Sequence, residues 1–343
     1  MAEKIGTELQ ISVIIMCFNR KDFLLNAIKS VLRQTLTRDK YEIVVTKNFQ
    51  DLEIDSYISQ NNIYSIAEGD VGIGTMVANA VEKTRGKYVS FLDDDDLFYP
   101  DKLSTIYEKT LKDPSIVYYH NSFNAIDSDG ANVLDFRHCH PFTPLLINDG
   151  CSHLSVRKVK NMSGDINMSS ITVRRDLLLK SIQFIRDITG LQDVFLFYLS
   201  ALSHEKMMFD SEILTGYRIH TSESHGNLAE FDGYSAGMRS VLLKYLRSYE
   251  ILLNKISAIS TDIKYEYLTN KCRYQLMVPQ KTGLLSTREL IYLLMHIRFA
   301  SDIRNQIILI AFGFFHLLMP KKITNLYIHR KIILDGSRYS RNI

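Results

Sequence analysis

Four consecutive aspartates, Asp93–Asp96, are the residues of this 343-residue chain whose types and spacing most directly indicate chemistry. They follow Tyr88–Leu92 (YVSFL), whose apolar and aromatic residues predict a buried strand. Adjacent carboxylates at the end of a buried strand repel one another, so either their pKa values rise or a cation binds among them. A hard divalent cation, Mg²⁺ or Mn²⁺, held by one or two carboxylates and by phosphate oxygens, is therefore the expected cofactor. The alternative is a solvated acidic run in which Asp96 only supports the following helix.

The segments that must position these aspartates alternate between two patterns. Short apolar runs with β-branched and aromatic residues predict strands at Ile11–Cys17, Tyr41–Thr46, Ile63–Ala67, Tyr88–Leu92 and Ile116–His120. Apolar residues at helical spacing predict helices at 22–35, 51–60, 75–83 and 100–111. Repeated strand–helix units imply an α/β fold with a parallel, helix-covered sheet. Ligands bind such sheets beyond the carboxyl ends of the strands, which selects residues 17–20, 46–51, 68–74 and 93–96.

The pattern changes beyond Asp127. The turn signal Asp127–Gly130 predicts a hairpin between residues 123–126 and 131–136. Further helices are expected at 174–185 and 193–202, and further strands at 207–209 and 213–219. From about residue 233 only helices are predicted, at 234–257, 262–278, 287–300 and 302–318, and Ser286 with Glu289 fits a capping box. We therefore predict two domains, residues 1–230 and residues 231–343.

These two regions differ in charge. Residues 1–230 carry 24 Lys and Arg against 31 Asp and Glu, whereas residues 231–343 carry 17 against 7. The basic region contains the apolar run Ile307–Met319, which is too short to span a bilayer. Three interpretations stay open: a helical extension packed in the fold or in a homodimer, peripheral contact with an anionic membrane surface, and a span that would have to enclose Arg304. No recognised nucleic-acid module accompanies the positive charge, so nucleic acid is not an expected partner.

Cysteine usage and the first residues bear on the compartment. Cys17, Cys139, Cys151 and Cys272 are scattered without a CxxC spacing, which favours reduced thiols. The first ten residues contain no apolar segment of the kind found in signal peptides. We therefore expect a cytoplasmic protein, with peripheral association at the inner face of the membrane as an open alternative.

Two segments resemble family 2 glycosyltransferases in order and spacing. ISVIIMCFNRKDFLLNAIKSVLRQT (11–35) is similar to that family's SVIIPTYNR and the helix ending SxLxQT, and GKYVSFLDDDDLFYPDKL (86–103) is similar to its GxYIxFLDxDDxxxPxKL. Three later segments resemble its acceptor-side loop, its Glu-Asp motif and an Arg-x-His segment: SSITVRRDLL (169–178), GLQDVFLFYLSAL (190–202) and GYRIHTSESHGN (216–227). The resemblance covers about residues 11–226.

The resemblance implies a GT-A fold, with helices on both faces of a mixed, mostly parallel sheet and a C-terminal helical extension. It also implies inverting transfer of a sugar from a nucleotide-diphosphate sugar to an acceptor hydroxyl, on a glycan, a lipid-linked molecule or another class. Asp93 and Asp95 match the Asp-x-Asp motif, so that Asp95 is the expected metal ligand and Asp93 contacts metal and ribose. Asp193 matches the aspartate of the Glu-Asp motif and is the expected base. A favourable charge at a helix N-terminus is its alternative role, and Asp187 and Glu205 are the next candidates for the base.

The resemblance also suggests which side chains bind the two substrates. The expected contacts of the nucleotide sugar are Phe18, Asn19, Arg20, Asn48, Asp93 and Asp94. Contacts with the diphosphate or the acceptor are expected from Arg218, His220, Ser169 and Ser170, although Arg218 and His220 could also be a solvent-facing pair. The chain departs from the family in four places: residues 46–51 replace its Asp-Asp-Gly-Ser, Met16 replaces the Pro of its first loop, Ala78 replaces an Asn, and Gln192 replaces the Glu of the Glu-Asp motif. These departures keep open a second function, nucleotide-sugar binding without transfer.

Overall fold

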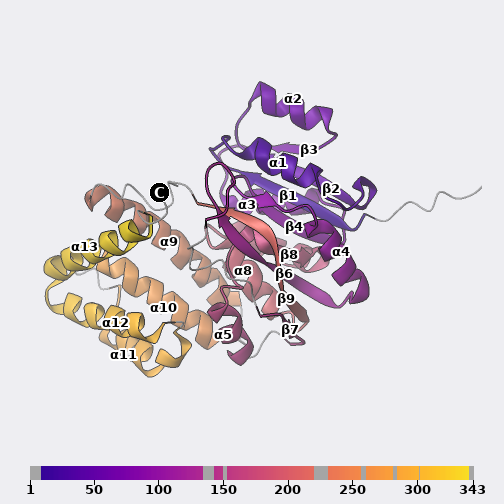
Figure 1. Cartoon of the computed structure of the whole chain (residues 1–343). Helices are drawn as coiled ribbons and strands as arrows, with labels where there is room; N and C mark the ends of the chain where they lie inside the picture. Colours follow the sequence, from indigo (N-terminus) through magenta and orange to yellow (C-terminus); the bar gives the residue numbers. More distant parts are fainter. Residues whose placement is uncertain are drawn as a thin grey trace, which may run out of the picture. The chain divides into compact units, whose positions relative to one another are not determined.

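The computed structural model describes residues 9–133, 143–149, 153–219, 231–255, 260–280, 284–300 and 302–339 (Figure 1). The chain divides into two compact units. The first consists of Met1–Ile188 and Gln192–His220, and the second of Thr189–Leu191 and Thr221–Ile343. Residues 220–230 lie outside the described residues, so the domain boundary at residue 230 stays a prediction.

The first unit is built on a mixed sheet whose strands occur in the order β3-β2-β1-β4-β8-β6-β9-β5, with β7 paired to β9. The strands are β1 Ile11–Cys17, β2 Tyr41–Lys47, β3 Tyr64–Ala67, β4 Tyr88–Asp93, β5 Leu97–Phe98, β6 Ile116–Ile126, β7 Leu145–Ile147, β8 Ile171–Arg174 and β9 Lys206–Arg218. The first four in the sheet order are parallel, β8 is antiparallel to β4 and β6, and β6 is parallel to β9. All five strands predicted before residue 121 are confirmed, within a few residues at their ends.

Helices lie on both faces of this sheet. Those of the first unit are α1 Leu24–Leu32, α2 Leu52–Gln60, α3 Ile73–Lys83, α4 Lys102–Lys112, α5 His153–Asn161, α6 Arg175–Lys180, α7 Ile182–Asp187 and α8 Gln192–Ala201. Alternate residues of a strand point to opposite faces, and Ile11, Val13 and Ile15 of β1 pack in one core with buried residues of α1, α2 and α4. Helix α3 contacts β1 and β2 but contributes no residue to that core, so it covers the other face.

Two elements of the first unit differ from the prediction, and a third lies partly outside the described residues. The helix expected at 174–185 is instead the end of β8 followed by α6 and α7, which are interrupted at Ser181. The strands expected at 207–209 and 213–219 form one strand, β9. The polar residues 210–212 stay within the strand because its pairing with β6 shifts in register at Asn121 and Ser122. The predicted turn after Ile126 is present, with the amide of Asp127 donating to the carbonyl of Ala131, but residues 134–136 of the hairpin lie outside the described residues.

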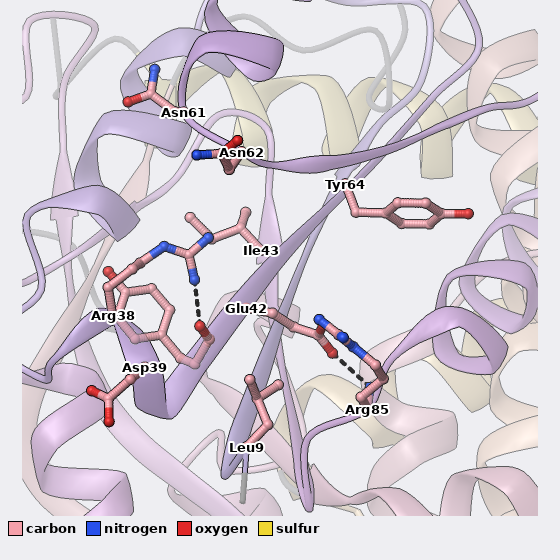
Figure 2. A pocket seen from close by; sticks show the side chains of 10 residues that line it. Leu9, Arg38, Asp39, Glu42, Ile43, Asn61, Asn62, Tyr64 and Arg85 are labelled. Carbon is pink, nitrogen blue, oxygen red and sulfur yellow. Dashed lines mark hydrogen bonds and ion pairs between the residues drawn. The ribbon is translucent and has the colours of Figure 1, made fainter. Parts of the chain in front are cut away.

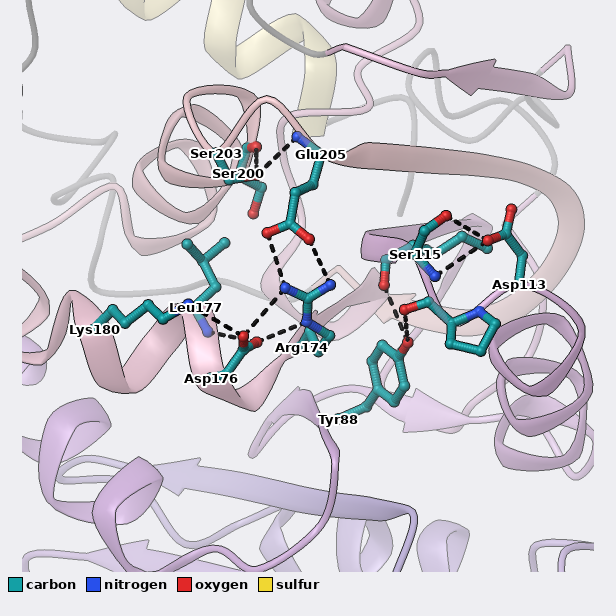
Figure 3. A network of polar contacts seen from close by, with 12 residues as sticks. Tyr88, Asp113, Ser115, Arg174, Asp176, Leu177, Lys180, Ser200, Ser203 and Glu205 are labelled. Carbon is teal, nitrogen blue, oxygen red and sulfur yellow. Dashed lines mark hydrogen bonds and ion pairs between the residues drawn. The ribbon is translucent and has the colours of Figure 1, made fainter.

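A polar network ties β8 to the segment that follows α8 (Figure 3). The Arg174 guanidinium lies between two carboxylates, with Nε 2.7 Å from Asp176 Oδ1 and Nη1 2.6 Å from Glu205 Oε2. Arg174 pairs in register with Tyr88, the first residue of β4, whereas Asp93 is the last. Glu205 is therefore engaged at the end of the sheet opposite to the aspartates, which argues against it as the base.

In the described residues of the second unit, all the secondary-structure elements are helices. Its helices are α9 Phe231–Lys255, α10 Ser260–Leu276, α11 Thr287–Met295, the 3₁₀ turn η4 Ile297–Phe299, α12 Ile303–Leu318 and α13 Pro320–Tyr339. The predicted capping box is confirmed, because Ser286 and Glu289 each accept from the other's backbone N–H. Helix α13 was not predicted: Pro320 does not end the helical region but opens a new helix, at the position that tolerates proline best. None of the described helices is long and apolar enough to cross a membrane.

We predict that Gly74→Ala lowers the free energy of unfolding by about 1–3 kcal/mol, because a methyl group overfills a packed contact. A Cβ at Gly74 in α3 would lie 2.4 Å from the carbonyl oxygens of both Ile185 and Ile188. Helix propensity alone predicts the opposite sign, a gain of about 1 kcal/mol for alanine over glycine. Urea unfolding distinguishes the two, with Gly69→Ala as the matched control, since nothing lies within 4 Å of a Cβ there. A more stable Gly74→Ala protein would contradict the close approach of α3 to Ile185 and Ile188.

Candidate active site at the carboxyl ends of the strands

The carboxyl ends of β1, β2 and β4 bring the predicted donor residues together. In register, Cys17 of β1 lies opposite Lys47 of β2, and Met16 lies opposite Asp93 of β4. The loops that follow these strands are therefore neighbours. Asn19 and Asn48 form a reciprocal pair: the Asn19 amide donates to Asn48 Oδ1 at 2.8 Å, and Asn48 Nδ2 donates to Asn19 Oδ1 at 2.7 Å.

Two further features of this edge suit a ligand. Asn19 has φ of +58°, a left-handed conformation that asparagine tolerates better than most residues. Beside it, Phe18 exposes 39% of its surface, which leaves an aromatic face open to solvent. The polar amide pair and the exposed ring offer hydrogen bonds and a stacking surface at one edge of the sheet.

The four aspartates differ in accessibility. Asp94 and Asp96 are buried, whereas Asp93 and Asp95 keep part of their surface exposed. Arg20 Nη2 lies 2.6 Å from Asp94 Oδ1 and 2.8 Å from Asp95 Oδ2, so the loop after β1 supplies a counter-charge to the loop after β4. The two acids of the predicted Asp-x-Asp motif are thus the two that keep exposed surface, although Asp95 shares Arg20 with Asp94, which also accepts from the Cys17 thiol.

The electrostatics of the cluster favour a bound cation. Burial raises the pKa of Asp93 well above its usual value, and the neighbouring aspartates and Asp193 raise it further. Burial, followed by the charge of Asp95, raises the pKa of Asp96 to about 7. Asp96 Oδ2 is also buried without a hydrogen-bond partner. Each of these features carries a free-energy cost that positive charge at the cluster would reduce.

Arg218 fixes the position of the acidic turn. Its backbone amide donates to Asp96 Oδ1 at 2.8 Å, and its Nε donates to the Asp95 carbonyl at 2.6 Å. Its Nη1 donates to the carbonyls of Asp127 and Ser128, and its guanidinium carbon lies 4.4 Å from the centre of the Phe23 ring. Arg218 is buried, so the alternative of a solvent-facing residue is wrong for it. His220 lies outside the described residues.

A short segment connects the aspartate cluster to the predicted base. The 3₁₀ turn η2, Met168–Ser170, follows Asn167, whose φ of +72° is unusual for a residue other than glycine. Ser169 Oγ accepts from the Asp93 amide at 3.0 Å, and the Asn167 amide donates to Asp193 Oδ2 at 3.0 Å. Ser169 and Ser170 are fully buried, and Ser170 Oγ accepts from Asn167 Nδ2. Direct substrate contact for the two serines stays a prediction, whereas the hydrogen bonds indicate that they position the turn.

Asp193, the predicted base, has a pKa closer to neutral pH than an ordinary aspartate. It lies in the first turn of α8 and is partly buried. Burial raises its pKa to about 6, with a contribution from Asp165, while the backbone amides of Val194 and Asn167 hold it down. Asp193 in turn raises the pKa of Asp93, so the two carboxylates lie within electrostatic reach of each other.

Lys102 lies beneath this site and was not singled out from the sequence. Its ammonium group is fully buried and donates to Ser169 O at 2.7 Å, Asn121 Oδ1 at 2.7 Å and Thr215 Oγ1 at 3.0 Å. Burial lowers its pKa well below the usual value, and Asp96 partly offsets that shift. Its place in the segment YPDKL was the sequence signal that could have indicated a role for Lys102. Its hydrogen-bond partners are distant in the chain, so local pattern does not reveal them.

A shallow hollow lies elsewhere, at the amino ends of the strands (Figure 2). Its lining includes Leu9 before β1, Glu42 near the start of β2 and Arg85 before β4. Arg85 and Glu42 form an ion pair at 2.8 Å. The hollow contains none of the predicted site residues, because those follow the opposite ends of the same strands.

Comparison with known proteins finds a family match within residues 12–171. Residues 12–171 match the model of the family "Glycosyl transferase family 2". An uncharacterized glycosyltransferase of Rickettsia bellii is 30% identical over 134 residues, which are 38% of this chain and 19% of that protein. Chondroitin synthase of Escherichia coli is 28% identical over 35% of this chain and 18% of its own length. The chain thus spans about a fifth of the length of these relatives, and the match confirms the predicted family over residues 12–171.

Two solved structures share the fold. TarS 1-349 of S. aureus, in complex with UDP-GlcNAc, has a TM-score of 0.55 at 14% identity and covers 87% of this chain and 89% of its own. The mannosyltransferase PcManGT of Pyrobaculum calidifontis, in complex with GDP-Man and Mn²⁺, has a TM-score of 0.53 at 14% identity and covers 91% and 88%. These likenesses confirm the predicted GT-A fold.

We predict that the ligand-free protein loses stability as the pH rises from about 4 to about 7. The pKa of Asp96 is raised from 3.8 to about 7, so in this range the folded chain holds a proton that the unfolded chain releases. Asp96→Asn removes this ionisation and should raise the free energy of unfolding at pH 8 by about 1–2 kcal/mol. Urea unfolding at pH 5 and pH 8 measures the effect, with the exposed Asp187→Asn as control. The same pH dependence in Asp96→Asn and the unmodified protein would show that Asp96 ionises freely in the fold.

Proposed function

We propose that this chain, whose residues 12–171 belong to glycosyltransferase family 2, transfers a sugar from a nucleotide-diphosphate sugar to an acceptor hydroxyl with inversion. One observation carries the proposal: the partly exposed Asp93 and Asp95 lie within electrostatic reach of Asp193, whose pKa is about 6. The first two carboxylates suit a metal-bound diphosphate, and the third suits a proton acceptor. Single-displacement inversion requires one base and no enzyme nucleophile, and this set of residues supplies one.

The residues at β4 fit a divalent cation shared with the substrate. Within the described residues, no group of three or more His, Cys, Asp or Glu is arranged to hold a metal ion by itself. Mg²⁺ and Mn²⁺ sites of nucleotide enzymes commonly use one or two carboxylates and complete their coordination with phosphate oxygens and water. Asp95 and Asp93 would hold the ion, and bound there it would neutralise charge on the departing nucleotide diphosphate. Arg20, now paired with Asp95, would then be released toward the phosphates.

The proposed donor site extends from the aspartates along the ends of β1 and β2. Phe18 offers a stacking surface, and Asn19 and Asn48 offer amide groups at the same edge of the sheet. Asn48 stands where the family has its Asp-Asp-Gly-Ser segment, and the neighbouring Lys47 is buried and ion-paired with Asp55 at 2.8 Å. We propose that the amide pair, rather than an aspartate, contacts the nucleobase.

That same replacement supports a second candidate function, nucleotide-sugar binding without transfer. Here Lys47, the last residue of β2, is a buried cation paired with Asp55 of α2 across the loop that replaces the acidic segment. In a binding protein, Asp193 would serve only its hydrogen bonds to Asn167 and Val194. Consumption of a sugar nucleotide in the presence of an acceptor distinguishes the two functions, because only the transferase releases a nucleoside diphosphate.

We predict that Asp193→Asn lowers turnover by about 10²–10⁴-fold, the usual contribution of a general base. Donor affinity should change by less than about 1 kcal/mol, since the residue acts on the acceptor. In the unmodified enzyme, kcat/KM for the donor should fall about tenfold per unit as the pH drops below about 6, because this ratio reports the free enzyme and only the ionised carboxylate accepts a proton. Calorimetric donor binding and steady-state transfer across pH measure both effects.

Asp187→Asn is the matched control for this experiment. It makes the same chemical change at an exposed residue near the end of α7, and Asp187 is also the next candidate for the base. Equal turnover in Asp193→Asn and the unmodified enzyme would remove Asp193 from the mechanism. A loss in Asp187→Asn instead would assign the base to that residue.

We predict that Asp95→Asn lowers turnover on the order of 10²-fold or more, because the metal loses a charged ligand. The variant should also bind UDP or GDP more weakly, but only when Mg²⁺ or Mn²⁺ is present. Calorimetry with each nucleotide, with and without Mn²⁺, measures this directly. Equal weakening with and without the ion would mean that Asp95 contacts the nucleotide without a metal.

A further inference from the structure

The second unit carries an apolar surface that no described part of the chain covers. Helices α11 and α12 contact each other and lie side by side in Figure 1. Large apolar residues on both are exposed, among them Met295 at 74%, Phe315 at 54% and Leu318 at 74%. We call this surface the α11–α12 face; its exposed apolar residues are Ile291, Leu294, Met295, Ile303, Ile307, Phe315, Leu318 and Met319.

The spacing of these residues makes a continuous stripe. On α12, Ile307, Ala311, Phe315 and Leu318 follow one another at intervals of four, four and three, which places them on one side of a helix. The opposite side of α12, with Leu309, Ile310 and Gly313, is buried in the core of the unit. Helix α12 is therefore apolar on both sides, whereas a helix of a globular protein that faces water is polar on its outer side.

Exposed cations bound the same surface. Arg288 lies three residues before Ile291, Arg304 lies three residues before Ile307, and Lys321 and Lys322 follow the end of α12. Arg298, between α11 and α12, is also exposed. Residues 284–322 contain these five cations and two acids, Glu289 and Asp302. Glu289 is paired with Lys271 at 2.6 Å. The face is thus an apolar centre with a positively charged rim.

We propose that the α11–α12 face docks on an anionic lipid surface. Apolar side chains that enter the headgroup region, together with basic residues that contact anionic headgroups, are the two components of interfacial binding. A second copy of this chain is a poorer occupant, because a two-fold contact would set the basic rim against itself. A nucleic acid would use the cations but leave the apolar centre unpaired. This docking is independent of the transfer reaction proposed above.

The test is flotation of the full chain with lipid vesicles. Vesicles of phosphatidylcholine with phosphatidylglycerol should bind the protein at least about tenfold more than vesicles of phosphatidylcholine alone, and binding should weaken with salt. The double variant Ile307→Glu, Phe315→Glu should lose at least about tenfold of this binding, because two charges then enter the apolar centre. The matched control is Leu52→Glu, Leu111→Glu, which changes two exposed leucines of the first unit, at 90% and 62% exposure, and should bind as the unmodified protein does.

Circular dichroism melting verifies that both variants are folded. Should the double variant fail to fold, Arg304→Gln, Lys322→Gln replaces it, and loss of the preference for anionic vesicles is then the expected result. Equal flotation of the folded variant and the unmodified protein would overturn the proposal. Light scattering without lipid gives the other outcome: a doubled mass that the apolar-face variant abolishes, with no vesicle binding, would assign the face to a second copy instead.

Discussion

Mutual repulsion among the four carboxylates at the end of β4 is the constraint on which the arrangement of the first unit depends. Two of the four are buried, where an unpaired negative charge costs several kcal/mol. The fold responds with two arginines, Arg20 after β1 and Arg218 at the end of β9, while Lys102 in α4, whose pKa is lowered by its own burial, lies within electrostatic reach of Asp96. These cations compensate the cluster incompletely, since the pKa values of Asp93 and Asp96 stay raised. What remains is a site that gains stability when positive charge enters it.

Burial decides which of the four carboxylates can be reached by a cation from solvent. Asp94 meets Arg20 inside the fold, and Asp96 receives the backbone amide of Arg218. Asp93 and Asp95 keep exposed surface, so incoming positive charge meets those two first. The run of four acids therefore does two things with one segment. Asp94 and Asp96 anchor the turn, and Asp93 and Asp95 keep part of their surface exposed, whereas all four carboxylates of a solvated acidic run would be exposed.

The sequence predicted the parts of this site whose signals are local. The strand that ends at Asp93 and the parallel strands beside it follow from runs of β-branched residues, and the position of the site follows from the rule for parallel sheets. Lys102 and Asn167 could not be found in this way. The partners of Lys102 are Asn121, Ser169 and Thr215, up to 113 residues away, and the conformation of Asn167 depends on the turn that it opens. The sequence predicted two short strands in place of the single strand β9, because polar residues in its middle are accommodated by irregular pairing with β6, which leaves no local pattern.

The segment from Asn167 to Ser169 couples the two halves of the proposed chemistry. At one end, Ser169 Oγ accepts a hydrogen bond from the Asp93 amide. At the other end, the Asn167 amide donates to Asp193 Oδ2. The two carboxylates also interact through space, since Asp193 raises the pKa of Asp93. Such an interaction is reciprocal, so negative charge at Asp93 opposes ionisation of Asp193. A cation held by Asp93 and Asp95 would add positive charge within electrostatic reach of Asp193, and such a charge favours the ionised form of a carboxyl group. The proposed metal ligands and the proposed base are therefore linked in two ways, by the hydrogen bonds of this segment and by charge.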